Sequence, residues 1–275
     1  MHEPINLSCG VLYVATGEKY IKEVIEAARS CKESNRYPIA VITDSANHPL
    51  PKDLFDIVIV KEAQYSYRDK LLLQYTPFEK TIFLDTDTLV IEDLSDLFRL
   101  LDFREFAIHQ ADEGYEFSMP DVSNAMPEFN TGVIAYRMTE NVKKLFSDWN
   151  ASFDVIKDIS TDQYHLRKTL YESDVRYATV SSAYNFIVYY NNYVIQKVKV
   201  LHGRPFSYLR EIAKEINIVH HNSGWRRTFY PFSHRFFILY MSPVARDSYK
   251  LLKGALRMHL GNVKRKVQHG FKKTS

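Results

Sequence analysis

A pair of aspartates separated by one threonine is the feature of this sequence that most directly indicates chemistry. Asp85 and Asp87 follow TIFL (81–84), a short apolar run that predicts a buried strand. Residues i and i+2 of an extended chain point to the same side, so both carboxylates would face one spot. Carboxylates this close repel each other unless a cation lies between them, and hard oxygen ligands suit Mg²⁺ or Mn²⁺. The pair therefore indicates a divalent-metal site, with a solvated turn or a helix cap as the alternative.

Two other segments carry side chains that could complete such a site. His202 follows VKVL (198–201), and its imidazole would complete a set of two aspartates and one histidine, although a histidine at a strand end is more often structural. Gly203 would let the backbone approach a phosphate closely, and Arg204 could neutralise that phosphate. Asp162 lies in a Thr-Asp-Gln string at an expected helix start, where compensation of the helix dipole alone would explain a carboxylate.

These residues lie at the ends of elements that alternate between strand and helix. Apolar runs predict strands, and apolar residues three and four apart predict helices. The expected strands are 9–15, 37–44, 57–60, 81–84, 132–137 and 194–203, and the expected helices lie around 21–28, 68–74, 141–153, 162–171 and 208–216. Residues 111–128 are expected to form a long surface loop. Apolar strands that alternate with helices indicate an α/β fold with a mostly parallel central sheet and helices on both faces.

The composition is that of an ordinary globular protein. The chain has 275 residues, of which 45% are hydrophobic and 25% charged, which argues against extensive disorder or a fibrous repeat. Its net charge of +3 is too small to indicate a nucleic-acid partner by itself. Cys9 and Cys31 are the only cysteines, and the first residues lack a signal-peptide pattern. A reducing, cytoplasmic setting is therefore expected.

Charge is distributed unevenly along the chain. Residues 243–275 contain nine basic residues and one acid, a net charge of +8, which leaves −5 for the other 242 residues. We therefore divide the chain into a main domain, 1–240, which carries the expected site, and a basic tail, 241–275. Apolar residues of the tail lie on one face of an expected helix: Leu252, Leu256, Leu260, Val263 and Val267. This helix could make peripheral contact with the anionic inner face of a membrane, or its apolar face could pack on the main domain.

Taken together, the motifs resemble those of a known enzyme family. In chain order they are VATGEKY (14–20), a strand ending near Asp44, YRDKLLLQY (67–75), FLDTDTLV (83–90), FNTGVIAYR (129–137), TDQ (161–163), YNF (184–186) and LHGRP (201–205). They are similar to the motifs of the metal-dependent GT-A glycosyltransferases. The closest resemblance is to family 8, which includes glycogenin and bacterial lipopolysaccharide galactosyltransferases. The resemblance implies the GT-A nucleotide-diphospho-sugar transferase fold.

The resemblance also implies a role for each matching residue. Asp85, Asp87 and His202 would bind Mn²⁺ or Mg²⁺, and the diphosphate of a UDP-sugar would complete the coordination. The residues that would border the uracil and ribose, the phosphates or the donor sugar are Val14, Thr16, Tyr20, Lys70, Thr86, Asn130, Gly132, Gly203 and Arg204. Within this set, Tyr20 would stack on the base. The catalytic residues Asp162 and Gln163 would lie beside the anomeric carbon.

The implied activity is the transfer of a hexose from a UDP-sugar to a glycan or glycolipid acceptor, with retention of anomeric configuration. Glycogenin has a further aspartate three residues before the equivalent of Asp162, and Ile159 takes that place here. Recognition of the sugar hydroxyls therefore stays open. Asp162 itself could be a nucleophile, an electrostatic stabiliser or a hydroxyl anchor.

Two other functions are compatible with parts of the sequence. A nucleotidyltransferase would use a similar sheet, but VATGEKY (14–20) lacks the Gly-rich phosphate loop that such enzymes usually carry. A non-catalytic nucleic-acid-binding protein would use the basic tail, and it would bind DNA or RNA with a strong dependence on salt. That function leaves the ordered motifs unexplained, so no nucleic-acid partner is expected.

Overall fold

The computed structural model describes residues 7–111, 119–157, 159–189 and 196–221. The expected basic tail, 241–275, lies outside these ranges, as do residues 112–118 of the expected surface loop. No helix within the described ranges combines the length and apolar character needed to cross a membrane.

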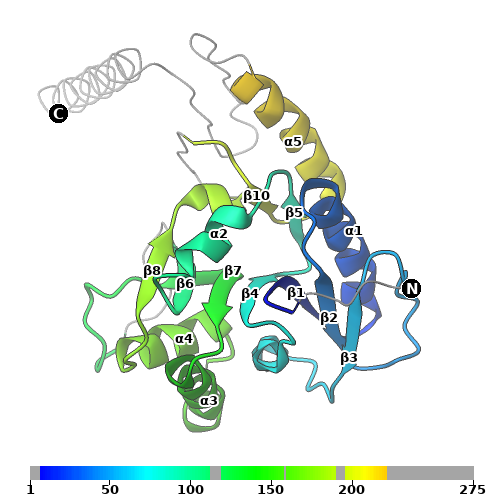
Figure 1. Cartoon of the computed structure of the whole chain (residues 1–275). Helices are drawn as coiled ribbons and strands as arrows, with labels where there is room; N and C mark the ends of the chain where they lie inside the picture. Colours follow the sequence, from blue (N-terminus) through cyan, green and yellow to red (C-terminus); the bar gives the residue numbers. More distant parts are fainter. Residues whose placement is uncertain (1–6, 112–118, 158, 190–195, 222–275) are drawn as a thin grey trace, which may run out of the picture.

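A seven-stranded sheet with the order β3-β2-β1-β4-β7-β6-β8 forms the centre of the described part (Figure 1). β7 runs antiparallel to both of its neighbours, β4 and β6, whereas the other neighbouring pairs are parallel. The sheet is therefore mostly parallel, as the sequence predicts. Its strands are β1 Cys9–Ala15, β2 Ile39–Thr43, β3 Ile57–Val60, β4 Lys80–Leu84, β6 Phe106–Gln110, β7 Phe129–Arg137 and β8 Tyr177–Val180.

Helices cover both faces of this sheet. α1 and α2 pack on one face, and α3, α4 and the 3-10 helix η1 pack on the other. Their bounds are α1 Glu18–Ser34, η1 Tyr67–Tyr75, α2 Ser95–Leu100, α3 Glu140–Val155 and α4 Asp162–Tyr171.

Alternate side chains of β1 show why its apolar run has no polar face. Val11 and Tyr13 lie in the core beneath α1 and α2, whereas Leu12 lies in the core beneath α3, α4 and η1. Successive residues of a strand point to opposite faces of the sheet. A strand with helices on both faces must therefore be apolar at every position, and β1 has its polar chemistry only where it ends, at Thr16.

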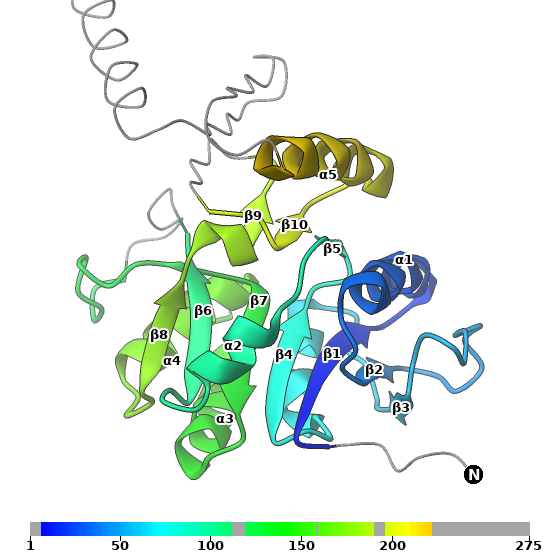
Figure 2. The same cartoon turned by 45° about the horizontal axis from the view of Figure 1, so that its top comes forward.

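A second, three-stranded sheet lies beside the first and carries α5 (Figure 2). Its order is β5-β10-β9, in which β10 is antiparallel to β5 and parallel to β9. The bounds are β5 Thr88–Val90, the short helix η2 Ser182–Tyr184, β9 Phe186–Ile187, β10 Val200–His202 and α5 Phe206–His221. Two ion pairs, Arg204–Glu23 and Arg210–Glu26, join the start of α5 and the segment before it to α1.

Three sequence expectations need correction. Of the strand expected over 194–203, residues 194–195 lie outside the described ranges, and within 196–203 only Val200–His202 form a strand, because the partner β5 has three residues and the ladder ends where Val200 pairs with Val90. The helix expected over 68–74 is a 3-10 helix, Tyr67–Tyr75. The third strand, β3, is not buried on both faces. It is a sheet edge, and Val58 and Val60 are nearly half exposed.

Gly10 provides a test of the packing between β1 and the chain before β4. A Cβ atom at this position would lie 2.3 Å from the ring of Phe78, which is itself buried. Gly10→Ala should therefore lower the free energy of unfolding by about 1–3 kcal/mol, the usual effect of overpacking a core. Urea denaturation measures this difference. Glu79→Ala, an exposed neighbour of Phe78, should change it by no more than about 0.5 kcal/mol. Equal stability of the two variants would show that the ring can move aside.

Candidate active site

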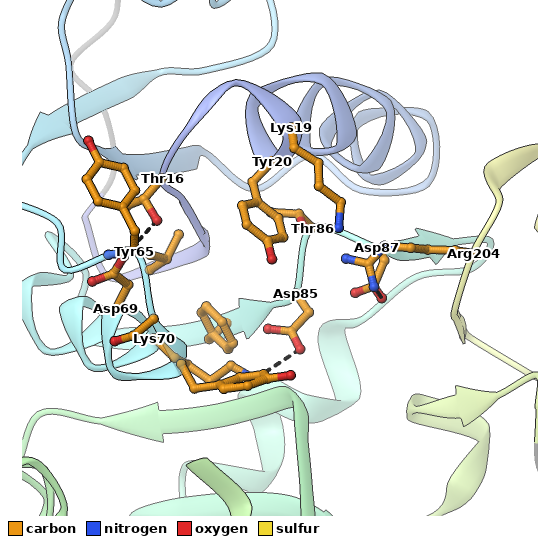
Figure 3. Close-up of a pocket in the computed structure, with 14 residues that line it drawn as sticks. Thr16, Lys19, Tyr20, Tyr65, Asp69, Lys70, Asp85, Thr86, Asp87 and Arg204 are labelled. Atoms are coloured by element: carbon orange, nitrogen blue, oxygen red, sulfur yellow. Dashed lines mark hydrogen bonds and ion pairs between the residues drawn. The ribbon is translucent and has the colours of Figure 1, made fainter. Parts of the chain in front are cut away.

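A cleft of about 480 Å³ opens at the carboxyl ends of β1 and β4, the edge where ligands bind in open α/β sheets. Figure 3 shows that its walls come from the start of α1, from η1 and from the turn between β4 and β5. Among the residues that the sequence assigns to the donor or the metal, those that line the cleft are Val14, Thr16, Tyr20, Lys70, Asp85, Thr86, Asp87 and Arg204.

The structure brings the three expected metal ligands together at one end of this cleft. Asp85, Asp87 and His202 offer ligand atoms that all lie within 4.8 Å of one another. His202 Nε2 is 3.3 Å from Asp87 Oδ1 and 3.9 Å from Asp85 Oδ2. The small sheet creates this proximity, because β10 places His202 opposite Thr88, the residue after Asp87.

A chain of side-chain amides fixes the orientation of the His202 ring. The backbone N–H of Gly132 donates to Asn130 Oδ1 over 3.0 Å, so the Asn185 amide, 2.8 Å away, must donate to the same oxygen. Asn185 Oδ1 then faces His202 Nδ1 at 2.9 Å and accepts its proton. The neutral ring therefore keeps its lone pair on Nε2, the nitrogen that faces the two aspartates.

Gly132 leaves the space that this ring occupies. A Cβ atom at Gly132 would lie 2.2 Å from His202 Cε1 and 2.5 Å from Nδ1. Asn130 and Gly132 thus lie behind the imidazole and support it, and their expected contact with the donor sugar stays a prediction. Asn185 belongs to the YNF motif (184–186), but no feature of that motif connects its amide with His202.

Lys70 connects the expected metal site with the expected catalytic aspartate. Its Nζ lies 3.0 Å from Asp85 Oδ2, 3.0 Å from Asp162 Oδ2 and 2.8 Å from Thr131 Oγ1. The Thr131 hydroxyl also donates to Asp162 Oδ2 over 2.5 Å. η1 holds this lysine in place through Arg68, whose guanidinium forms two hydrogen bonds to the Asp154 carboxylate on α3. Asp162 is therefore joined to the metal group through Lys70, and its expected place beside the anomeric carbon stays a prediction.

Burial and neighbouring charges set the pKa values of Lys70, Asp85 and Asp87. Burial opposes the charged form of Lys70, but the carboxylates of Asp162 and Asp85 outweigh it and raise the lysine pKa above its usual value. Burial raises the pKa of Asp85, and the Lys70 charge opposes this effect. Burial also acts on Asp87, but the hydrogen bond and the positive charge of His202, when that ring carries a second proton on Nε2, and the charge of Arg204 lower the Asp87 pKa to about 2. Asp87 is therefore the more strongly ionised of the two aspartates.

Arg204 reaches the same aspartate from the other side. Its Nη1 lies 2.6 Å from Asp87 Oδ2, while Nε and Nη2 each donate to the Glu23 carboxylate over 2.8 Å. The Thr86 hydroxyl donates to the same carboxylate over 3.0 Å. Glu23 is a residue that the sequence analysis missed, because a glutamate in the middle of an amphipathic helix usually lies on its solvated face.

The opposite end of the cleft contains a buried carboxylate, Asp69, that was also missed. It accepts hydrogen bonds from the backbone N–H groups of Gln64 and Tyr65 and from the Thr16 hydroxyl, at 2.7–2.9 Å. Tyr65 adopts a φ of 52°, and its hydroxyl donates to Asp44 over 3.1 Å. These bonds fix the turn that forms this end of the cleft.

Six of the residues that the sequence assigns to the site are not among those that line the cleft: Asn130, Gly132, Asp162, Gln163, His202 and Gly203. Gln163 is the half-buried second residue of α4, and its role at the anomeric carbon stays a prediction. Gly203 has a φ of 148°, and a Cβ atom there would lie 2.7 Å from Val188 Cγ2. The chain can therefore turn from β10 toward Arg204 only with a residue that lacks a side chain.

Comparison with known proteins gives a result for the fold alone. A scan against protein-family models finds no match, and a search of curated proteins finds no relative. Solved structures do match. The galactosyltransferase LgtC, in complex with donor and acceptor sugar analogues, superposes with a TM-score of 0.55 at 14% identity over 79% of this chain and 97% of its own. The glycosyltransferase GlyE of Streptococcus pneumoniae TIGR4 gives a TM-score of 0.52 at 17% identity over 86% of this chain.

The fold is that of the GT-A glycosyltransferases. The chain spans 55% of GlyE and 47% of the bifunctional glycosyltransferase WbbM, with which it shares 16% identity and a TM-score of 0.52. The predicted fold class is thus confirmed. In this GT-A fold, as the sequence predicts, the aspartate pair follows a central strand, and a histidine from a distant strand joins it.

Gly132→Ala should weaken metal binding by displacing the His202 ring. Loss of a group that orients a metal ligand typically lowers affinity by about 10–100-fold, and a similar loss of Mn²⁺ affinity is expected here, measured from the free-ion signal in electron paramagnetic resonance. Val133→Ala is the matched control, because the Val133 side chain faces the core beneath α1. It should lower the melting temperature and leave Mn²⁺ affinity unchanged. If Mn²⁺ affinity is unchanged in Gly132→Ala, His202 is not a ligand of the metal.

Proposed function

We propose that this protein is a metal-dependent glycosyltransferase that transfers a hexose from a UDP-sugar to a glycan or glycolipid acceptor, with retention of anomeric configuration. The observation that supports the proposal most is the convergence of Asp85, Asp87 and His202 at one end of a cleft. Two cations, Lys70 and Arg204, line the same cleft. A divalent metal and two basic side chains are what a diphosphate leaving group requires.

The donor set fits a divalent cation. Two carboxylates and one imidazole nitrogen, whose lone pair the amide chain directs toward the aspartates, lie close enough to share an ion. Carboxylates suit both Mg²⁺ and Mn²⁺, and the imidazole ligand favours Mn²⁺ over Mg²⁺. Bound here, the metal would neutralise the charge that develops on the diphosphate as the bond to the sugar breaks.

The side chains around this group have separable tasks in the proposed reaction. Arg204 would bind the diphosphate, since a guanidinium matches the geometry of phosphate oxygens. Lys70 would hold Asp162 at the sugar, because its ammonium already contacts that carboxylate. Asp162 is buried and accepts from Thr131, which fixes its orientation. A fixed carboxylate can stabilise positive charge at the anomeric carbon, and Gln163 would assist from the next position of α4.

The hydrogen-bonding groups at the far end of the cleft favour uracil as the base of the donor. The Asp69 carboxylate can only accept, so the Thr16 hydroxyl must use its proton for Asp69. Thr16 Oγ1 then offers only lone pairs to a ligand in the cleft. Uracil presents an N3–H donor to such an acceptor, whereas cytosine presents a lone pair at the same position. Tyr20, which also lines the cleft and is partly exposed, would stack on the base.

The domain division and the role of the tail are proposals of the sequence alone. We assign 1–240 to the catalytic domain and 241–275 to the basic tail. A tail of this charge would hold the enzyme at an anionic membrane surface near a glycolipid acceptor. The tail lies outside the described residues, and the site lies within 14–204.

Nucleotide binding should depend on the metal. UDP is expected to bind in calorimetric titrations with Mn²⁺ and to lose most of its affinity in EDTA, since the ion links the diphosphate to Asp85 and Asp87. CDP should bind with Mn²⁺ at least about tenfold more weakly, because its N3 lone pair would face that of Thr16. Asp87→Asn should remove the metal dependence, and Asp53→Asn, an exposed aspartate outside the cleft, should keep it. Equal binding of UDP with and without metal would contradict the proposed function.

Asp162→Asn should separate binding from turnover. The amide keeps the shape of the side chain and removes its charge, so Mn²⁺-dependent UDP affinity should stay within a few-fold of wild type. Turnover of a UDP-sugar, measured as UDP release, should fall by at least about 10²-fold, the effect of losing one transition-state interaction. Asp148→Asn, which changes a carboxylate on α3 that pairs with the exposed Lys144 and has no contact with the site, serves as the control. If turnover is unchanged in Asp162→Asn, this aspartate serves only the helix dipole.

A further inference from the structure

Three nitrogens of the Arg204 guanidinium contact two carboxylates, and these two carboxylates have different roles. Nε and Nη2 donate to the two oxygens of Glu23, and Nη1 lies 2.6 Å from Asp87 Oδ2. Asp87 is a ligand in the proposed metal site, whereas Glu23 belongs to α1 and lies outside the ligand group. Figure 3 shows Arg204 beside Asp87 at the edge of the cleft.

The backbone holds this arginine close to the metal group. Gly203 N–H donates to the Asp87 carbonyl oxygen over 3.0 Å, and the Tyr189 hydroxyl bonds to both backbone polar groups of Arg204. The side chain itself is less constrained, since more than two fifths of it is exposed. Arg204 can therefore move its guanidinium by a side-chain rotation while its Cα stays in place.

A guanidinium keeps its charge at every accessible pH. In this arrangement one positive charge already lies on an oxygen of Asp87 before any metal arrives. A divalent cation bound to Asp87 would lie close to the guanidinium on the same carboxylate, and the two positive charges would repel each other. Binding of the metal alone would therefore weaken the contact between Arg204 and Asp87 without replacing it.

A diphosphate changes this balance. Its oxygens accept hydrogen bonds from a guanidinium in the same paired geometry as a carboxylate. When metal and diphosphate enter together, Arg204 exchanges Asp87 for the phosphate, and Asp87 becomes fully available to the ion. The two ligands then bind with positive coupling, and each raises the affinity of the other by the same factor.

We infer that Arg204 is an internal counter-cation of the metal ligand Asp87 and that Glu23 is the positioning residue that holds it there, so that the metal alone binds weakly and binds well only with a nucleoside diphosphate. The inference rests on the proposed function, because it assumes the metal site and the nucleotide cleft. In this inference Glu23 lowers the affinity of the site for the metal alone, and it does so without contacting the substrate.

The inference predicts an unusual result for Arg204→Gln. Removal of a cleft residue should tighten the binding of Mn²⁺ alone, by at least about fivefold, the lower end of typical coupling between sites. The same substitution should weaken Mn²⁺-dependent UDP binding, because the diphosphate loses its guanidinium. Glu23→Gln should also tighten the binding of Mn²⁺ alone, by a smaller factor than Arg204→Gln, since the guanidinium would no longer be held against Asp87.

The experiment titrates MnCl₂ into the full chain without nucleotide and then with saturating UDP, and it follows free Mn²⁺ by electron paramagnetic resonance. Thermal melts confirm that each variant is folded. Lys19→Gln is the matched control, because it removes one positive charge from the same cleft lining without removing a hydrogen bond to Asp87. The double variant Glu23→Gln/Arg204→Gln should bind Mn²⁺ alone like Arg204→Gln, since Glu23 acts only through the guanidinium.

Three results would overturn the inference. Arg204→Gln could bind Mn²⁺ alone no more tightly than wild type does. Lys19→Gln could tighten Mn²⁺ binding as much as Arg204→Gln, which would show an effect of total charge. Glu23→Gln could change Mn²⁺ affinity by the same factor in the wild-type chain and in the Arg204→Gln variant. Failure of the proposed function is a different outcome, in which the wild-type chain binds no Mn²⁺ even with UDP present.

Discussion

The repulsion among three carboxylates is the constraint on which the site depends. Asp85, Asp87 and Asp162 come from two distant segments and meet at one sheet edge, all largely buried. Water cannot screen charges in such a place, so each one needs a cation. Lys70 lies between Asp85 and Asp162, and Arg204 and His202 lie on either side of Asp87. These side chains come from η1, from β10 and from the segment after β10, so the second, smaller sheet contributes directly to the site.

The antiparallel strand β7 has a particular task in this arrangement. It carries Thr131 beside Lys70 and Gly132 behind His202, so it contacts both halves of the site. A Rossmann-like sheet that continued in parallel would place a helix connection at this edge. In this chain the strand instead passes between the metal group and α4. The carbonyl of Gly132 also accepts the Asp85 N–H, which ties the start of the aspartate turn to the same strand.

The sequence was sufficient for the elements whose apolar pattern is strong. β1 and β3 were predicted with their observed bounds, and Asp85, Asp87 and His202 were placed together through the order of the motifs. β6 and β8 were not predicted, because FAIHQ and YATV are short, mix polar with apolar residues and gain their stability from pairing with distant strands. Glu23, Asp69 and Asn185 were missed for a related reason. Each acts through a partner far away in the sequence, and nothing in its own neighbourhood distinguishes it from an ordinary polar residue.

The two ion pairs that join α1 to the segment around the start of α5 have a consequence for the solution conditions of the protein. Glu23 and Glu26 lie on one side of α1, and Arg204 and Arg210 approach them from more than 180 residues later in the chain. These side chains are partly exposed, so mobile ions can reach them, and the screening length at physiological ionic strength is about 8 Å. Dissolved salt therefore acts on the contact between this segment and α1, and hardly at all on the apolar cores of the large sheet. The edge of the cleft beside Arg204 should accordingly loosen in concentrated electrolyte while the remainder of the fold stays intact.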